Sequence, residues 1–292
     1  MKELYGSIEA GGTKFVLAVG NEDLEIIERH SIPTQSPTDT MPAVIDFFKK
    51  FPVQSIGLGC FGPIDLNKNS STYGYITNTP KLDWHMYNIV GVLEKELAVP
   101  VAFTTDVNAA CYGEFVAGAA QNLDSCVYYT IGTGVGAGAI NKGTFIEGFS
   151  HPEIGHMTVN KAKGDFYEGN CPFHESCLEG FCAGPSIEKR TGKKGEELKE
   201  ENPVWEMISF YLAQAIYNTT LFLSPKKIIL GGGVMRQAHL LDQVKDKFQK
   251  MMNHYVEYPN IDEYLVLPSL GENSGTIGSL ALAKEEKIRI HK

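Results

Sequence analysis

The sequence predicts a two-domain α/β protein, because short apolar strands alternate with helices and one strand–turn–strand pattern occurs twice. The first copy spans residues 5–19, and the second spans residues 127–138, about 120 residues later. At 292 residues the chain is long enough for two domains, each with its own core. We therefore expect two similar halves that each open with a hairpin.

Three glycine turns follow predicted strands, at Gly11–Lys14, Gly132–Gly134 and Gly231–Gly233. Glycines at strand ends allow the backbone to turn tightly and to approach a ligand closely. Two such hairpin turns facing each other across a cleft offer backbone donors, and the hydroxyls of Thr13 and Thr133, to a triphosphate. An ordinary hairpin remains the alternative interpretation of any single turn.

The other elements follow from periodicity and chain breakers. Apolar residues from Trp205 to Phe222 recur at helical spacing, and Pro225 follows the end of this helix. The remaining predictions are strands over 53–62 and 101–105, a helix over 108–118, an exposed loop over 67–75, a solvated surface helix and loop over 186–203, and a crossover between the halves over 113–124.

The composition is that of a soluble globular chain, with 43% hydrophobic and 21% charged residues. A formal net charge of -9 argues against binding to nucleic acid or to an anionic membrane, because both require a basic face. The N-terminus leaves no room for a signal peptide, and no apolar run approaches the roughly 18 residues that span a bilayer. We expect a cytoplasmic protein.

The six cysteines fall into two groups. Scattered cysteines in apolar sequence are predicted to be buried; these are Cys60, Cys111 and Cys126. Cys171, His174 and Cys177 form a Cys-x2-His-x2-Cys core, and His156 precedes it by fourteen intervening residues.

Four nitrogen and sulfur ligands complete a tetrahedral zinc set without a position for water, which predicts a structural Zn²⁺. Binding of this metal would also fix the neighbouring carboxylates Glu153 and Glu179. We expect Cys182 to lie outside the cluster and His151 to be a surface residue. A chance grouping of these residues in a loop is the alternative.

Neither familiar nucleotide motif fits the glycine turns. A P-loop needs a helix directly after its lysine, whereas Lys14 is followed by strand-like sequence. The alternating glycines Gly132, Gly134 and Gly136 also differ from the Gly-x-Gly-x-x-Gly of dinucleotide-binding proteins.

In combination, the motifs resemble the ROK family, which groups repressors and sugar kinases, and more narrowly its bacterial zinc-containing fructokinases. The resemblance runs from about Leu4 to Ala283. Its motifs are Glu9–Lys14, Phe61–Asp65, Tyr73–Lys81, Asp106–Ala110, Ile131–Gly136, Glu153–His156, the zinc segment ending Glu179-Gly180, and Gly231–Val234.

The resemblance implies an actin-like ATPase (ribonuclease H-like) fold, MgATP as phosphoryl donor, a hexose hydroxyl as acceptor and a homodimer. It implies domains over 1–117, completed by a C-terminal helix over 275–292, and over 118–274, with a zinc-binding loop over 151–182. It implies Asp106 as the catalytic base, and Gly62, Asn78, Thr105, Glu153, His156 and Glu179 as sugar contacts. The implied nucleotide contacts are Gly11, Gly12, Thr13, Lys14, Gly132, Thr133, Gly134, Gly184, Pro225, Gly231, Gly232 and Gly233.

Two positions depart from the family pattern. Glu9 stands where the family usually has Asp, and Thr105 stands where many relatives have Asn. Fructose is the favoured acceptor, and mannose or glucose the alternatives. A sugar-responsive repressor would need a helix-turn-helix segment before the first glycine turn, which here begins at Gly11. A non-catalytic sugar sensor would require loss of the catalytic residue, and Asp106 is present.

Overall fold

The computed structural model describes residues 3–290 and divides them into two compact units. The first unit runs through Asn122 and also contains Phe145–His151 and the chain from Glu272 on. The second unit contains Leu123–Thr144 and Pro152–Gly271. Residues 291–292 of the predicted C-terminal helix lie outside the described residues.

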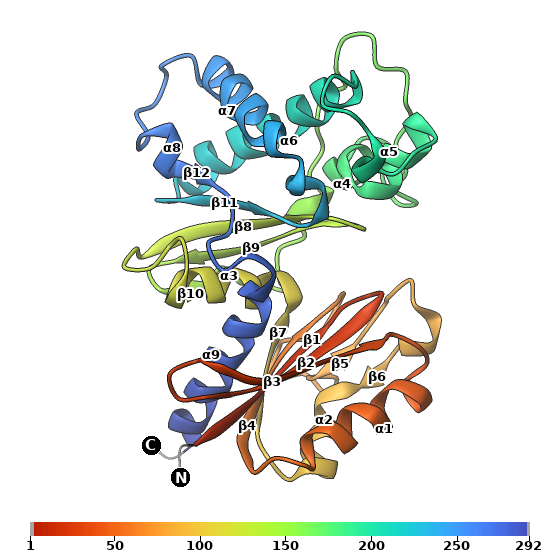
Figure 1. Ribbon diagram of the computed structural model, residues 1–292, viewed down its shortest axis with the longest axis vertical. Helices are drawn as coiled ribbons and strands as arrows, with labels where there is room; N and C mark the ends of the chain where they lie inside the picture. The colour runs from red at the N-terminus through yellow and green to blue at the C-terminus, as the bar shows by residue number, and fades with distance from the viewer. Residues whose placement is uncertain (1–2, 291–292) are drawn as a thin grey trace. The chain divides into compact units, whose positions relative to one another are not determined.

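The first unit is built on a five-stranded sheet of order β3-β2-β1-β4-β7 (Figure 1). Its elements are β1 Leu4–Ala10, β2 Lys14–Asn21, β3 Ile26–Pro33, α1 Pro37–Phe48, β4 Val53–Cys60, β5 Tyr75–Ile76, β6 Tyr87–Asn88, α2 Ile89–Leu97, β7 Val101–Thr105, α3 Asp106–Ala117 and α9 Ser274–Ile290. Strands β1, β2 and β3 pair antiparallel, whereas β1, β4 and β7 pair parallel.

Helices cover both faces of this sheet. Phe48 of α1 lies against Gly6 on one face, and Ser279 of α9 lies against Gly57 on the other. Helix α9 also packs along α3 and against β4 and β1 (Figure 1). The C-terminal segment of the chain therefore completes the core of the N-terminal sheet.

The second unit repeats this plan around a sheet of order β10-β9-β8-β11-β12. Its elements are β8 Ser125–Ile131, β9 Val135–Asn141, β10 Thr144–Phe145, α4 Leu178–Cys182, α5 Gly184–Thr191, α6 Val204–Leu223, β11 Ile228–Gly231, α7 Ala238–Met252, α8 Ile261–Tyr264 and β12 Leu265–Val266. Strands β8 and β9 form an antiparallel hairpin, and β8, β11 and β12 are parallel. The prediction of two similar α/β halves that open with hairpins is confirmed.

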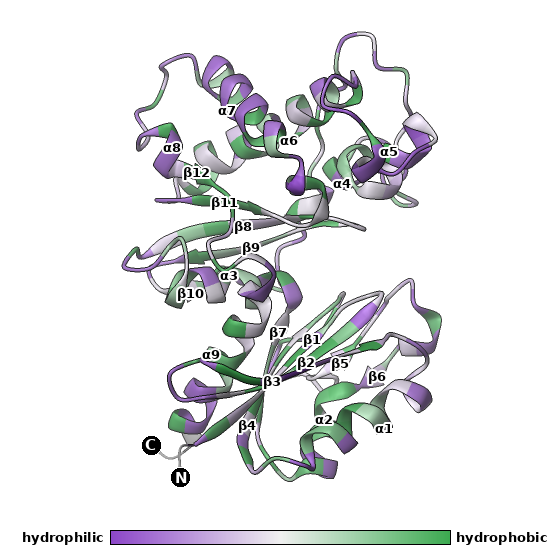
Figure 2. Cartoon of the chain, viewed as in Figure 1, coloured by the Kyte–Doolittle hydropathy of each residue, from purple (hydrophilic) through white to green (hydrophobic). Residues whose placement is uncertain are grey.

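Helix α6 lies over this sheet and α7 packs against α6. The Tyr129 hydroxyl of β8 is hydrogen-bonded to the Thr219 hydroxyl of α6, with 2.5 Å between the oxygens. Buried residues recur every fourth position along α7, from Leu240 to Met252, and Figure 2 shows hydrophilic residues on its remaining surface. Among residues 3–290, no helix has the length and apolar character needed to cross a bilayer.

A buried ion pair anchors the loop that precedes Cys171. Arg190 Nη1 donates to Asp165 Oδ1 at 2.8 Å, and only 7% and 3% of these two side chains are exposed. Tyr211 donates its hydroxyl hydrogen to Asp165 Oδ2 at 2.5 Å, and the Arg190 guanidinium lies 4.0 Å above the Tyr167 ring. Arg190 was predicted to be solvated, and that prediction is wrong because Ile187 turns this face of α5 inward.

The Asp165 carboxylate is stabilised as the charged form. Burial alone would raise its pKa, but the hydrogen bonds from Arg190 and Tyr211 lower the pKa of Asp165 below its ordinary value. A carboxyl group with a depressed pKa stabilises the fold above its unfolded pKa of about 3.9, and that stabilisation is lost as the pH falls through the lower folded value.

We predict that Arg190→Met lowers the free energy of unfolding by about 3 kcal/mol at pH 7, because it leaves the Asp165 carboxylate buried without its cation. The difference from the wild type should shrink in acid, as Asp165 takes up a proton. Urea denaturation at pH 7 and below pH 4 measures both effects. The control is Lys250→Met, which removes an exposed pair with Asp246 and should cost less than about 0.5 kcal/mol. Equal effects of the two variants would contradict the prediction.

Candidate functional site

Asp106 is the first residue of α3, directly after the end of β7. The Thr105 hydroxyl caps this helix by accepting from the Asn108 N–H at 3.1 Å, which starts the helix two residues earlier than the sequence predicted. The Asp106 Oδ1 accepts from the Val107 N–H at 2.9 Å, and the side chain is half-buried. A carboxylate at a helix N-terminus is held at the positive end of the helix dipole.

The first glycine turn joins β1 to β2 and projects from the first unit. Gly11 N–H donates to the Lys14 carbonyl at 3.0 Å, and Thr34 holds the turn by donating to the carbonyls of Gly11 and Thr13. Gly12, Thr13 and Lys14 are exposed. This geometry presents the tip of the turn to a ligand.

Glu9 lies at the buried end of β1, behind this turn. Thr276 of α9 donates its hydroxyl hydrogen to the Glu9 carboxyl. Burial raises the pKa of the Glu9 carboxyl, against the opposing effects of the Thr276 hydrogen bond and of Arg29 and Lys14. The longer Glu side chain at this position therefore links the first glycine turn to α9.

Lys81 was assigned no role from the sequence, yet its side chain reaches the same turn. A methyl group added to Gly12 would lie 3.3 Å from Lys81 Cε. The segment is anchored by Trp84, whose indole N–H donates to the Gln35 carbonyl at 2.8 Å and whose ring lies 5.4 Å from that of Phe15. No spacing rule in the sequence connects these positions, because 69 residues separate Gly12 from Lys81.

The predicted sugar contacts Gly62 and Asn78 lie on neighbouring segments of the first unit. Thr77 donates to the Pro63 carbonyl through its N–H at 2.8 Å and through its hydroxyl at 3.0 Å. His151 is only 8% exposed, and its Nε2 accepts from the Ile64 N–H at 3.3 Å. The prediction of a surface His151 is therefore wrong, because this ring fixes the loop after Gly62.

In the second unit, the other two glycine turns lie together. Gly132 N–H donates to the Gly134 carbonyl at 2.8 Å and thereby closes the second turn. Gly184, the first residue of α5, donates its N–H to the Gly132 carbonyl at 2.7 Å. A methyl group added to Gly132 would lie 3.9 Å from the Gly233 nitrogen. Gly132, Gly184 and Gly233 thus form one cluster, with Thr133 exposed at its tip.

Two other predicted nucleotide contacts lie at the end of β11. Gly231 ends the strand and Gly232 follows with φ +91°, a backbone conformation that favours glycine. Pro225 is buried and precedes the strand, so the length of β11 separates it from the glycine cluster. The structure does not bring Pro225 to the other predicted contacts.

The four predicted metal ligands are brought together, with ligand atoms all within 4.8 Å of one another; they are His156, Cys171, His174 and Cys177. Cys171 Sγ lies 3.7 Å from His156 Nδ1 and 3.5 Å from His174 Nδ1. A tetrahedral zinc ion requires about 3.6 Å between a sulfur and a nitrogen ligand. The donor set and its spacing therefore fit such a metal.

The surroundings of Cys177 disfavour its thiolate form. Burial, together with the neighbouring Cys171, raises the pKa of Cys177 to about 11. A bound cation would offset this effect, since metal binding releases thiol protons. As predicted, Cys60, Cys111 and Cys126 are buried, and Cys182 is not one of the four ligands.

The predicted sugar contacts of the second unit lie in or beside the Cys/His cluster. Glu153 is exposed and precedes the 3₁₀ turn Ile154–His156. His156 directs Nδ1 toward Cys171, and its Nε2 lies 4.0 Å from Glu179 Oε1. The second Glu179 oxygen accepts from the Val135 N–H at 3.0 Å. Glu179 thus lies between the Cys/His cluster and the second glycine turn.

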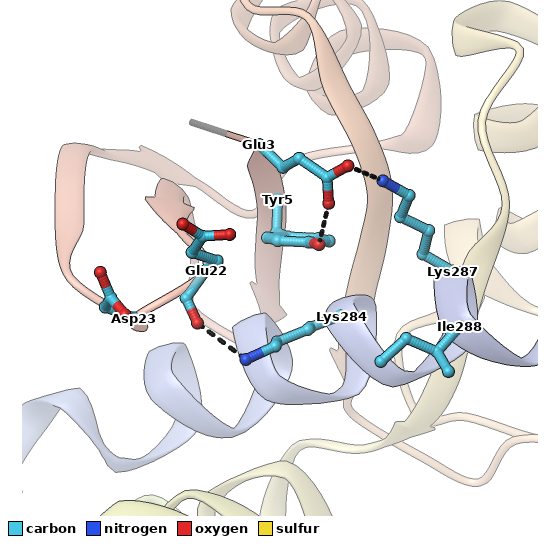
Figure 3. Close-up of a pocket in the computed structure, with 7 residues that line it drawn as sticks. All are labelled: Glu3, Tyr5, Glu22, Asp23, Lys284, Lys287 and Ile288. Carbon is cyan, nitrogen blue, oxygen red and sulfur yellow. Dashed lines mark hydrogen bonds and ion pairs between the residues drawn. The ribbon is translucent and has the colours of Figure 1, made fainter. Parts of the chain in front are cut away.

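A separate hollow of the first unit contains none of the predicted site residues (Figure 3). Both lysines of this hollow have partners within it: Lys287 pairs with the Glu3 carboxylate, and Lys284 donates to the backbone carbonyl of Glu22 at 2.9 Å.

The fold and the glycine turns define the class of protein. A ROK hexokinase from Thermus thermophilus is similar with a TM-score of 0.81 at 24% identity, over 99% of this chain and 100% of that one. A ROK family glucokinase from Streptomyces griseus, in complex with glucose and AMPPNP, has a TM-score of 0.75 at 21% identity, over 97% and 99% of the two chains. The chain has the actin-like ATPase fold of these proteins.

Sequence comparison identifies the family. Residues 5–286 match the ROK family, and the chain belongs to it. The chain is 48% identical to a fructokinase from Streptococcus mutans, over 99% of this chain and 100% of the relative. It is 49% identical to a putative fructokinase from Bacillus subtilis, over 97% and 96% of the two chains.

Proposed function

We propose that this protein is an ATP-dependent hexose kinase that favours fructose and forms fructose 6-phosphate. The observation that carries the proposal is its similarity to four relatives named fructokinase or putative fructokinase, each 48% or 49% identical over at least 96% of this chain. The family match over residues 5–286 also covers the positions of the glycine turns, Asp106 and the Cys/His cluster.

Asp106 acts as the general base in the proposed reaction. Its carboxylate accepts the proton of the sugar hydroxyl as that oxygen attacks the γ-phosphorus, and the bond to the ADP leaving oxygen breaks. Two features of the first unit suit this role: the half-buried position at the start of α3 and the fixed Oδ1, which accepts from Val107. The contact with Val107 thereby orients the carboxylate at the end of β7.

The glycine turns bind the nucleotide in this proposal. The exposed tip Gly12–Lys14 offers amide donors and a lysine to phosphate oxygens. The cluster of Gly132, Gly184 and Gly233, with Thr133, offers donors from the second unit. Mg²⁺ accompanies ATP and neutralises charge on the transferring phosphoryl group.

The proposed sugar contacts are described separately for each unit. Gly62, Asn78 and Thr105 are the contacts proposed for the first unit. A Thr105 hydroxyl that accepts from Asn108 can still donate to a sugar oxygen. The contacts proposed for the second unit are Glu153, His156 and Glu179, which lie at or beside the Cys/His cluster.

We assign the Cys/His cluster to one structural Zn²⁺, held by His156, Cys171, His174 and Cys177. The ion would supply a rigid attachment for a loop that carries sugar contacts. His156 would bind it through Nδ1 and keep Nε2 for a hydrogen bond. A closed four-ligand set leaves the ion without a chemical step of its own.

Other acceptors and a non-catalytic role are the competing proposals. A glucokinase is 26% identical over 99% of this chain, and a xylose repressor is 26% identical over 91% of this chain. Mannose or glucose would be the alternative substrate, and a sugar sensor would bind without turnover. The homodimer and the cytoplasmic location stay predictions.

We predict that Asp106→Asn lowers kcat for the best sugar by about 10²–10⁴-fold, since it removes the base. The amide oxygen introduced by this substitution can still accept from Val107, so the fold should persist. ADP release is measured with MgATP and fructose, mannose, glucose, N-acetylglucosamine or N-acetylmannosamine.

Asp124→Asn serves as the matched control, because the Asp124 carboxylate is exposed and forms a surface ion pair with Lys226. Its turnover should equal that of the wild type. Full turnover of Asp106→Asn would refute the assigned base, whereas a wild type that releases no ADP with any sugar would favour the sensor.

We predict that the purified protein contains about one zinc per chain and that Cys177→Ser loses it. Metal analysis and limited proteolysis of the loop report the loss. Cys182→Ala is the control, because Cys182 is equally buried but lies outside the cluster. A stable protein that contains no zinc and retains sugar-dependent activity would overturn the assignment.

A further inference from the structure

Glu179 contacts two features of the second unit that the sequence assigns to different tasks. Its Oε2 accepts from the N–H of Val135, the residue that follows the Gly132–Gly134 turn, at 3.0 Å. Its Oε1 lies 4.0 Å from Nε2 of His156, whose Nδ1 faces Cys171 Sγ in the Cys/His cluster. One carboxylate therefore joins the Cys/His cluster to the Gly132–Gly134 turn.

The short helix α4 strengthens this connection. The helix begins at Leu178, directly after Cys177, whose Sγ accepts from the Gly180 N–H at 3.3 Å. Glu179 lies in its only turn, and the chain then continues to Gly184, which donates to Gly132 at 2.7 Å. A displacement of Cys177 is therefore transmitted to both ends of the Gly132–Gly134 turn, through Glu179 to Val135 and through Gly184 to Gly132.

The space around the connection is fully occupied. A methyl group added to Gly155 would lie 1.7 Å from the Val135 carbonyl oxygen, and one added to Gly134 would lie 2.7 Å from Glu179 Oε2. Val135 is thus held through its N–H by Glu179 and against its carbonyl by the residue before His156. Packed contacts of this kind move together and leave little room for independent adjustment.

We propose that Glu179 is a positioning residue that couples metal occupancy to nucleotide binding at the Gly132–Gly134 turn. This inference rests on the proposed nucleotide role of that turn. With metal bound and no sugar present, His156 would be held through Nδ1 with Nε2 facing Glu179 Oε1, and the other Glu179 oxygen accepts from the Val135 N–H. Without metal, His156 and Cys177 move, and the turn loses its preorganised geometry. By linkage, nucleotide must strengthen metal retention by the same factor.

The test measures ADP affinity by calorimetry without sugar, in zinc-loaded and chelator-treated protein. We expect removal of zinc to weaken ADP binding about 10-fold in the wild type. In zinc-loaded Glu179→Gln, ADP affinity should fall toward the zinc-free value, and ADP should no longer slow the loss of zinc to a chelator. Glu175→Gln, an exposed residue between His174 and Cys177, is the control and should behave as the wild type.

A second measurement applies if the zinc-free protein unfolds. Amide exchange at Val135 in zinc-loaded protein should be faster in Glu179→Gln than in Glu175→Gln. Unchanged Val135 exchange, equal ADP affinity with and without zinc, or full coupling in Glu179→Gln would overturn the inference. Absence of ADP binding in every form would instead refute the proposed nucleotide role.

A different observation points to Lys81 in the first unit. Its Cε lies against Gly12 at the exposed tip of the first glycine turn, and the half-buried chain is anchored through Trp84. The Lys81 ammonium is bonded to this Cε and therefore lies near the backbone of the exposed turn. A cation beside backbone N–H groups suits an anion. We infer that Lys81 binds a phosphate oxygen of ATP, which rests on the proposed kinase activity.

Lys81→Met should lower kcat/KM for ATP about 10- to 100-fold, the effect of one charge-assisted hydrogen bond, while the KM for sugar changes little. Lys81→Arg should restore most of the loss, and Lys50→Met, at an exposed lysine after α1, should have no effect. A Lys81→Met enzyme with the ATP parameters of the wild type would refute the inference. Lack of wild-type turnover would refute the kinase proposal instead.

Discussion

In each unit a glycine allows close backbone contact, and this contact holds a segment of the candidate site in place. In the first unit, a methyl group on Gly278 of α9 would lie 1.8 Å from the Ala109 carbonyl oxygen of α3, within one turn of Asp106. In the second unit, Gly155 has the same relation to Val135, the residue that follows the Gly132–Gly134 turn. Both positions exclude a side chain, so each unit places its chemistry through backbone packing. The position of Asp106 therefore depends on α9, which lies more than 160 residues away in the sequence.

The sequence predicts this architecture well where the signal is local. The hairpins, the glycine turns and the long helix α6 follow from periodicity and chain breakers, and the spacing of the four Cys/His residues identifies the cluster. The start of α3 is less accessible, because it depends on whether the Thr105 hydroxyl caps the helix. A threonine before an aspartate allows either a strand residue or a cap, and only the hydrogen bond to Asn108 distinguishes them.

Long-range partners account for what the sequence does not predict. His151 reads as a surface residue because its neighbours are polar, yet its ring accepts from Ile64, which is 87 residues away. Arg190 lies in a charged stretch, yet its guanidinium pairs with Asp165 over an aromatic ring. Lys81 acquires a neighbour at Gly12 only through folding. In each case a polar side chain is explained by a partner from another element, and no local pattern encodes that partner.

The same long-range contacts limit the folding free energy that a bound metal would have to contribute. A structural zinc can contribute on the order of 10 kcal/mol where it orders an otherwise loose chain. Here the segment before Cys171 is already fixed by Asp165, Arg190 and Tyr211, and the chain beyond Cys177 is held by the Gly184 N–H, which donates to the Gly132 carbonyl. A bound metal would therefore order mainly the short stretch between these anchors. Its principal effect in this unit would be to orient His156 and Glu179, since the surrounding fold has its own buried contacts.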